Sequence, residues 1–123
     1  MPLNPAAFAL ASDCVAEAGM PAFARGHDPA ATGGRLVDVD LIDSFARAPG
    51  VPIFDKPDFE RPGVIRSATI LEAIRDGVPL PPIQVKASED GRFSLYDGFH
   101  RLHLWVALGY TRIPVEVVPR DYP

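Results

Sequence analysis

The sequence is poor in the residues that would cross-link the chain or carry it into a membrane. Its 123 residues include one cysteine, Cys14, which excludes an intramolecular disulfide framework and lies in an alanine-rich stretch typical of a buried thiol. No apolar run approaches the roughly 18 residues of a membrane span, and the N-terminus lacks the basic start of a secretory signal. We therefore expect a bacterial-type cytoplasmic protein without a membrane partner.

Basic charge is scarce as well. Sixteen acidic residues outnumber twelve basic ones, which leaves a net charge of −4. Because nucleic-acid affinity rests on lysines and arginines that neutralise phosphates, this balance argues against tight duplex binding, unless a local basic patch provides it. Ten of the twelve basic residues are arginine, which suits bidentate phosphate contacts but is also what a GC-rich genome produces. Composition therefore allows DNA as a partner without favouring it.

The abundant residues predict one small domain built of short elements. Apolar residues make up 47% of the chain, enough for a modest core, while fourteen prolines and ten glycines divide it into short segments. We assign residues 1–34 to an N-terminal helix and loop, and residues 35–120 to the main domain. The helix is expected over 4–19, with Asn4 as its cap and Pro5 in its first turn.

The first half of the main domain is expected to hold one strand and one helix. Apolar residues that alternate with polar ones from Val37 to Leu41 predict a half-buried strand, and a proline-rich irregular segment follows over 43–66. The next helix is expected over 70–76, because Thr69 and Glu72 have the spacing of a capping box.

The second half is expected to hold a hairpin, a helix and a last strand. The hairpin strands cover 83–87 and 93–96, the helix covers 99–108, and the last strand covers 112–118, where Pro114 favours an edge position or a strand start. Each of the three helices has a glycine at its expected end: Gly19, Gly77 and Gly109. This order of elements predicts an α/β (α+β) fold, a small mixed sheet with packed helices.

The most informative segment is Leu95-Tyr96-Asp97-Gly98-Phe99-His100-Arg101, which leads from a strand directly into a helix. The first N–H groups of a helix lack internal partners and carry partial positive charge, so acidic residues are preferred there. His100 and Arg101 are cation-capable instead. Their presence predicts that an anion, above all a phosphate, completes the site.

Each residue of this segment also has a structural alternative. Gly98 would let the backbone pass close to a ligand, or would only form the turn. His100 would contact phosphate or act as an acid or base, or would only cap the helix. Arg101 would clamp a phosphate, or pair with Asp97. Asp97 would hold Mg²⁺ through water or orient a hydroxyl, or would cap the helix. No metal site is predicted, although His100 and His103 share a helix face.

Three segments together resemble the ParB/sulfiredoxin-like superfamily, which includes the ParB N-terminal domain-like nucleases. They are Ile74-Arg75-Asp76-Gly77 followed by Leu80-Pro81-Pro82-Ile83-Gln84-Val85, then Asp90 to Arg101, then Leu108 to Val115. Each is weak alone, and their order and spacing carry the match from Arg35 to Arg120. The resemblance implies a small domain that holds the phosphates of ATP or CTP, with Mg²⁺ in some relatives, at the helix start after Gly98.

The triplet after Gly98 separates this chain from the better-known relatives. Sulfiredoxins have Cys-His-Arg there and partition proteins have Glu-Arg-Arg, whereas this chain has Phe99-His100-Arg101. The missing cysteine excludes thiol-based sulfinic repair by this motif. The missing glutamate, and the short stretch after Val118, argue against a full partition role. The form Asp-Gly-x-His-Arg is more like that of stand-alone members and serine-kinase relatives.

The resemblance also adds binding residues on the preceding helix. A Lys and a Ser that touch nucleotide in sulfiredoxins fall at Arg66 and Thr69, while a third polar contact falls at Ala73, which cannot reproduce it. Phe99 either packs inward or stacks on a base. The predicted nucleotide site comprises Arg66, Thr69, Gly98, Phe99, His100 and Arg101, with Asp97 and His100 as catalytic candidates.

Three functions remain open at this point. The leading one is a nucleotide-phosphate-binding protein that carries out Mg²⁺-dependent phosphoryl transfer or nucleotide hydrolysis. The alternative is a module that binds nucleotide or DNA phosphate without turnover, which the missing cysteine and glutamate favour. A ParB-like nuclease is the third, and the net acidity and the lack of clustered carboxylates weigh against it.

Overall fold

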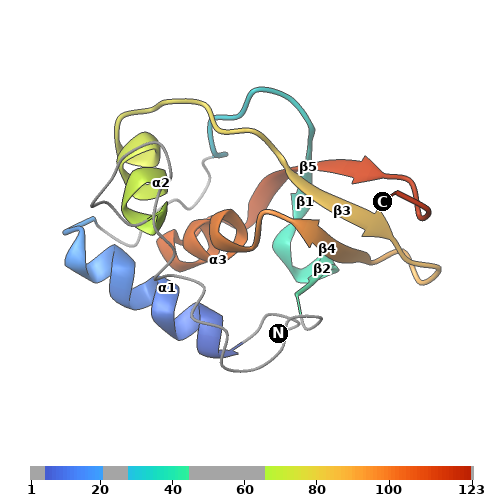
Figure 1. Cartoon of the computed structure of the whole chain (residues 1–123), viewed down its shortest axis with the longest axis horizontal. Helices are drawn as coiled ribbons and strands as arrows, with labels where there is room; N and C mark the ends of the chain where they lie inside the picture. The colour runs from blue at the N-terminus through green and yellow to red at the C-terminus, as the bar shows by residue number, and fades with distance from the viewer. Residues whose placement is uncertain (1–4, 21–27, 45–65, 123) are drawn as a thin grey trace.

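The computed structural model describes residues 5–20, 28–44 and 66–122, which form a mixed α+β fold (Figure 1). The helices are α1 (Pro5–Glu17), α2 (Arg66–Arg75) and α3 (Phe99–Leu108), and the strands are β1 (Arg35–Asp38), β2 (Ile42–Asp43), β3 (Ile83–Ala87), β4 (Phe93–Asp97) and β5 (Arg112–Val118). The α+β class expected from the sequence is confirmed. No described helix has the length and apolar character that crossing a bilayer requires.

The sheet is curled because its two edge strands are neighbours in the sequence. Its strand order is β1-β5-β3-β4-β2, yet only the 3₁₀ turn η1 (Val39–Leu41) separates β1 from β2. Four Cα–Cα steps reach at most about 14 Å, whereas four strand spacings of a flat sheet measure about 19 Å. The sheet must therefore bend. Arg92, directly before β4, donates from Nη2 to the Asp40 carbonyl of η1 at 2.8 Å.

The continuous strand expected from Val37 to Leu41 is wrong, because η1 interrupts it. The Asp38 carboxylate accepts a hydrogen bond from the Asp40 N–H at 3.1 Å, and this bond turns the chain out of the strand. Leu41 is consequently exposed, and Ile42 takes the inward position. The alternation of apolar and polar residues does not reveal that the Asp38 side chain bonds to a nearby backbone N–H.

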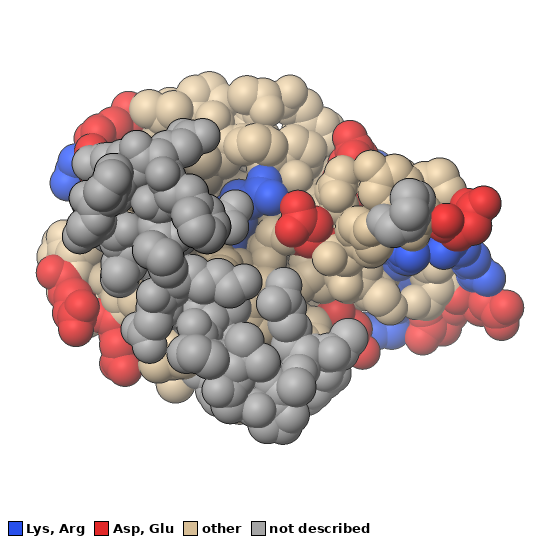
Figure 2. Space-filling view, viewed as in Figure 1, with Lys and Arg blue, Asp and Glu red and all other residues tan. Residues whose placement is uncertain are grey.

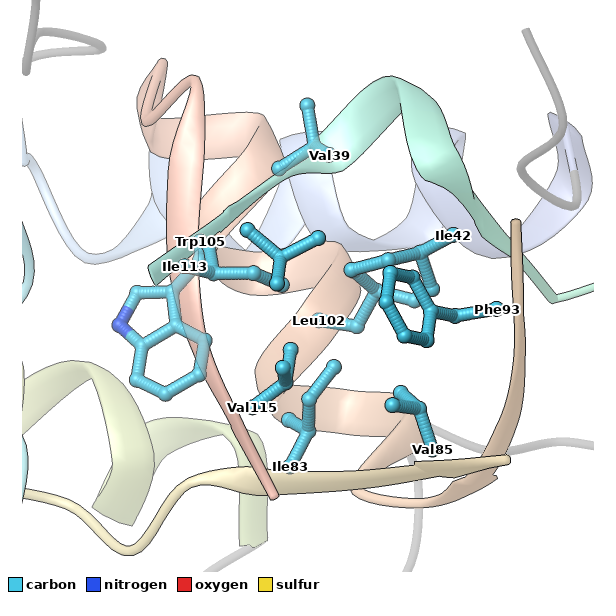
Figure 3. Packing of buried hydrophobic residues seen from close by; sticks show 10 residues of the cluster. Val39, Ile42, Ile83, Val85, Phe93, Leu102, Trp105, Ile113 and Val115 are labelled. Carbon is cyan, nitrogen blue, oxygen red and sulfur yellow. The ribbon is translucent and has the colours of Figure 1, made fainter. Parts of the chain in front are cut away.

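The concave side of the sheet holds the main core. Figure 3 shows side chains from the strands, η1 and α3 pointing toward one another in this space. Ile42, Ile83 and Ile113 are fully buried there, and Leu102 and Trp105 of α3 fill the remaining room. Trp105 is itself fully buried. One face of α3 is thus fixed against the sheet.

A second apolar cluster fixes the opposite face of α3. Its members come from all three helices: Ala7, Ala11, Val15, Ile70, Leu71, Phe99, Leu104 and Leu108. In Figure 1, α3 lies between the sheet and the other two helices. The N-terminal helix is therefore packed into the molecule through α3. The division at residue 34 stays a prediction.

All three helices end alike, at the glycines expected from the sequence. At each end the N–H of the glycine and the next N–H bond back to carbonyls of the last turn, as in Gly77 N to Ile74 O at 3.2 Å and Val78 N to Ala73 O at 2.9 Å. This pairing is a Schellman motif, in which the glycine takes a positive φ. The glycine stops are confirmed.

The expected start of α2 is wrong by one turn. The helix begins at Arg66, so Thr69 lies within its first turn and does not cap it. Arginine and alanine are good helix formers, and adding residues to a formed helix costs far less than starting one. The capping-box spacing was therefore outweighed by the propensity of the residues before it.

Of the two positions expected for Pro114, an edge strand or a strand start, the structure has the second, since Pro114 is the third residue of β5. β5 lies between β1 and β3. Its pairing with β1 covers Arg112 to Val115, whereas its pairing with β3 begins only at Val115. The half of β5 that contains Pro114 therefore has a strand on one side only, where a missing N–H is tolerated.

Candidate functional site

The candidate site is the turn from Asp97 to Arg101, where β4 leads into α3. Gly98 starts the helix with φ +102° and ψ 30°, a left-handed conformation that side chains rarely adopt. A Cβ atom at Gly98 would lie 2.6 Å from Ile83 Cγ2 and 2.9 Å from Ile83 Cβ. Close approach to β3, together with the positive φ, therefore explains this glycine without a ligand.

Arg101 is anchored to the entry of β3. Its Nη1 donates to the carbonyl oxygen of Pro81 and, at 3.2 Å, to that of Pro82. Its Nη2 lies 3.9 Å from Asp97 Oδ2, so the salt bridge considered from the sequence forms, at long range. The Arg101 side chain is 15% exposed and that of Asp97 is 64% exposed. The guanidinium is thus held in place while its carboxylate partner faces solvent.

His100 and Phe99 are both turned inward. His100 is 8% exposed, and Phe99 is 2% exposed within the helical cluster. Of the two alternatives for Phe99, inward packing describes this structure, so what remains near a ligand is its backbone. Its role in binding stays a prediction, as does that of His100.

The helix start itself fits an anion. Gly98 provides no side-chain cap, and the first turn of α3 contains no acidic residue. The first intrahelical bond runs from Leu102 N to Gly98 O at 2.9 Å, so the N–H groups of residues 99–101 precede the helical ladder. Figure 2 shows a basic and an acidic group side by side near the middle of this face, close to where β4 leads into α3.

The sequence also predicted two binding residues on α2, Arg66 and Thr69, and only the Thr69 side chain is described. α2 packs against α3 through Ile70 and Leu71. Thr69 is half-buried in the first turn of α2. The Arg66 side chain lies outside the described residues. Both remain predictions.

Sequence reasoning missed a buried polar contact beneath the turn. His103 Nε2 lies 3.2 Å from Ser44 Oγ, and His103 Nδ1 lies 2.8 Å from the Phe99 carbonyl oxygen. Burial lowers the pKa of His103, and the smaller opposing effect comes from its hydrogen bond to Phe99. Ser44 and His103 are 59 residues apart, so no local signal joins them. Among the described residues, no three His, Cys, Asp or Glu side chains gather as a metal site.

No family model and no curated protein matches this chain. The solved structures that are similar to it include two of the C-terminally truncated chromosome-partitioning protein ParB from Caulobacter crescentus. The complex with CTP-gamma-S is 22% identical, with a TM-score of 0.47, over 72% of this chain and 46% of that chain. The complex with the centromeric parS site is 22% identical, with a TM-score of 0.46, over 72% and 42%.

This chain thus spans less than half the length of those ParB chains. The likeness agrees with the ParB-like fold inferred from the motifs. At this identity and TM-score it carries no argument about what this chain binds.

Proposed function

We propose that the turn from Asp97 to Arg101 binds the phosphate of a nucleotide. The observation that carries the proposal is a helix start without a side-chain cap or an acidic residue, flanked by a buried histidine and an anchored arginine. Backbone N–H groups at such a start favour an anion by about 0.3–1 kcal/mol. A hydrogen bond to a charged group contributes about 1.5–3 kcal/mol, so Arg101 is expected to dominate.

Arg101 can bind an anion without leaving its anchor. A guanidinium has five N–H donors in a rigid fork. Nη1 is directed to the carbonyls of Pro81 and Pro82, which leaves Nη2 on the side of Asp97. An arriving phosphate would compete for this side of the guanidinium with the Asp97 carboxylate, which is largely exposed and 3.9 Å away, and such a long pair contributes little.

The nucleotide class follows from the resemblance, which names ATP and CTP. The ParB of one similar structure is complexed with CTP-gamma-S. Mg²⁺ would be held mainly by the nucleotide phosphates, with Asp97 reached through water, because this ion keeps several waters and takes few carboxylates. One exposed carboxylate beside the turn fits that role.

Turnover is a separate question from binding. Phosphoryl transfer or hydrolysis would use His100 as acid or base and Asp97 to orient a hydroxyl or the metal. A binding module without turnover is the second candidate. Phe99 favours it, because an inward apolar ring stands where relatives keep Cys or Glu. DNA phosphate as the ligand, and a ParB-like nuclease, remain alternatives.

The proposal is tested by calorimetric titration of the protein with ATP, ADP, CTP and GTP, with and without Mg²⁺. Arg101→Ala is expected to weaken nucleotide binding about 10- to 100-fold. The matched control is Arg120→Ala, which removes the same charge from an exposed arginine near the C-terminal end, paired with Glu89. It is expected to bind as the wild type does.

Phosphate release in the same samples separates the two candidates. Release that Arg101→Ala and His100→Gln abolish would identify an enzyme, and binding without release would identify a module. The proposal fails if the folded wild type binds none of the four nucleotides. Degradation of DNA that is lost in His100→Ala would instead promote the nuclease.

A further inference from the structure

A buried polar pair joins the start of α3 to the end of β2. The His103 imidazole contacts Ser44 through Nε2 and the Phe99 carbonyl through Nδ1. His103 is 0% exposed and Ser44 is 1% exposed. Neither residue is among those proposed to bind phosphate. His103 nevertheless contacts the candidate site, because Phe99 is the first residue of α3.

The two partners determine which nitrogen carries the proton. A backbone carbonyl only accepts hydrogen bonds, so Nδ1 of His103 must donate to Phe99. Burial keeps the imidazole neutral, and Nε2 is then an acceptor. The Ser44 hydroxyl therefore donates to Nε2. The pair forms one directed chain, from Ser44 through His103 to Phe99.

The same turn is held at two further points. Gly98 lies against Ile83 of β3, where even a methyl group would clash. Arg101 is bonded to the carbonyls of Pro81 and Pro82, before β3. The Phe99 ring also lies over the His103 imidazole, with centroids 4.3 Å apart. Contacts at residues 98, 99 and 101 thus fix the backbone of this turn.

Stability alone is a weak reason for a polar pair at this position. Two apolar side chains of similar shape often replace a buried hydrogen-bonded pair with little loss. What they cannot supply is a directed bond to one particular carbonyl. Donors that bind an anion work best when they are already oriented before the anion arrives.

We propose that His103 is a positioning residue for the phosphate site, since its imidazole, held by Ser44, fixes the Phe99 peptide and with it the first N–H groups of α3. This inference rests on the proposed function. It assigns His103 no contact with the ligand and no role in a proton transfer.

The test compares three variants at position 103. His103→Leu removes both hydrogen bonds. His103→Asn keeps an N–H donor near the Nδ1 position, and His103→Gln keeps an oxygen acceptor near the Nε2 position. Dissociation constants for CTP, ATP and inorganic pyrophosphate are measured by calorimetry, with thermal unfolding by circular dichroism to establish the folded fraction. His103→Leu is expected to bind about three- to tenfold more weakly, and His103→Asn to recover most of the loss.

A purely structural role would lower the melting temperature in His103→Leu and leave the dissociation constant of the folded protein unchanged, which would overturn the inference. Equal affinities for the Asn and Gln variants would overturn it too, and this comparison decides the matter if the Leu variant does not fold. If the wild type binds none of the ligands, the proposed function itself fails, and the inference fails with it.

Imidazole ¹⁵N chemical shifts provide an independent readout in the full-length protein. The neutral Nδ1–H tautomer is expected for His103, with both shifts altered in Ser44→Ala. The Nε2–H tautomer would leave Nδ1 unable to donate to the Phe99 carbonyl and would overturn the inference, whatever the binding data show.

Discussion

The two ends of α3 are marked by glycines with the same φ, +102°, yet they are completed in different ways. At the C-terminal end, Gly109 N bonds to Val106 O at 3.0 Å and Tyr110 N to Trp105 O at 3.1 Å, so the helix closes on its own carbonyls. At the N-terminal end, Gly98 supplies no side-chain cap. The same backbone conformation thus ends α3 at Gly109 and begins it at Gly98.

The comparison extends to the rest of the molecule. α1 and α2 end in the same Schellman pairing as α3, at Gly19 and Gly77. An end that satisfies its own backbone serves the fold alone, because it leaves little for a ligand to add. The start of α3 is where fixed geometry and cation-capable side chains coincide. Variants at this start test the difference.

Gly98→Ala is expected to lower the free energy of unfolding by about 2–5 kcal/mol. A positive φ costs a side chain about 1–2 kcal/mol, and forcing a methyl group into a packed site adds about 1–3 kcal/mol. Gly77→Ala is the matched control. It has φ +71° and nothing within 4 Å of an added Cβ atom, so only the first cost applies. Urea denaturation measures both.

Equal losses of unfolding free energy in the two alanine variants would mean that the contact with Ile83 adds no cost at Gly98 beyond that of its positive φ. A Gly98→Ala variant as stable as the wild type would show that the turn moves easily, and this would contradict a pre-oriented phosphate site.

Acid is expected to weaken the N-terminal end of α3 through His103. Burial holds the folded-state pKa of His103 below its unfolded value of about 6.5. The unfolded chain therefore takes up the proton first. Stability is full above about pH 6.5 and falls as the pH drops below it, with a slope of at most about 1.4 kcal/mol per pH unit for one proton.

Melting temperatures recorded between pH 7.5 and about 5 measure this effect, above the range in which most carboxylates titrate. His103→Gln, which does not titrate, is expected to flatten the dependence, and His100→Gln is the matched control on the same turn. An unchanged pH dependence in His103→Gln would contradict the assignment of a neutral imidazole.

Asp97→Asn is expected to change stability least, by less than about 0.5 kcal/mol. Its ion pair with Arg101 is long, at 3.9 Å, and the carboxylate is largely exposed. Binding should respond more than stability. Without Mg²⁺, removal of a negative charge beside the turn strengthens nucleotide binding, and with Mg²⁺ it removes a partner of the ion. Calorimetry under the two conditions checks this, and the same change in both would contradict a role for Asp97 with the metal.

Local patterns were enough for the second half of the fold. The bounds of β3, α3 and β5 agree with those expected, because their apolar periods lie between strong turn signals such as Gly91 and Gly109. Patterns failed where another local interaction competed. Asp38 turned an alternating stretch into η1, and residues 66–68 extended α2 past its expected cap. The proline-rich segment expected over 43–66 lies mostly outside the described residues.

The sequence by itself determined the identity of the candidate turn, because an arginine and a histidine at a helix start after Gly98 are visible in the chain. It also determined where each helix stops, since a glycine's freedom at positive φ is a local property. Only the tertiary structure decided what surrounds the turn. Ile83 against Gly98, the carbonyls of Pro81 and Pro82 around Arg101, and Ser44 beneath His103 come from residues far apart in the chain. Ile83 meets Gly98 across the paired strands β3 and β4. Ser44 reaches His103 because the three-residue link η1 carries β2 to the far edge of the curled sheet, and no local pattern specifies such a closure.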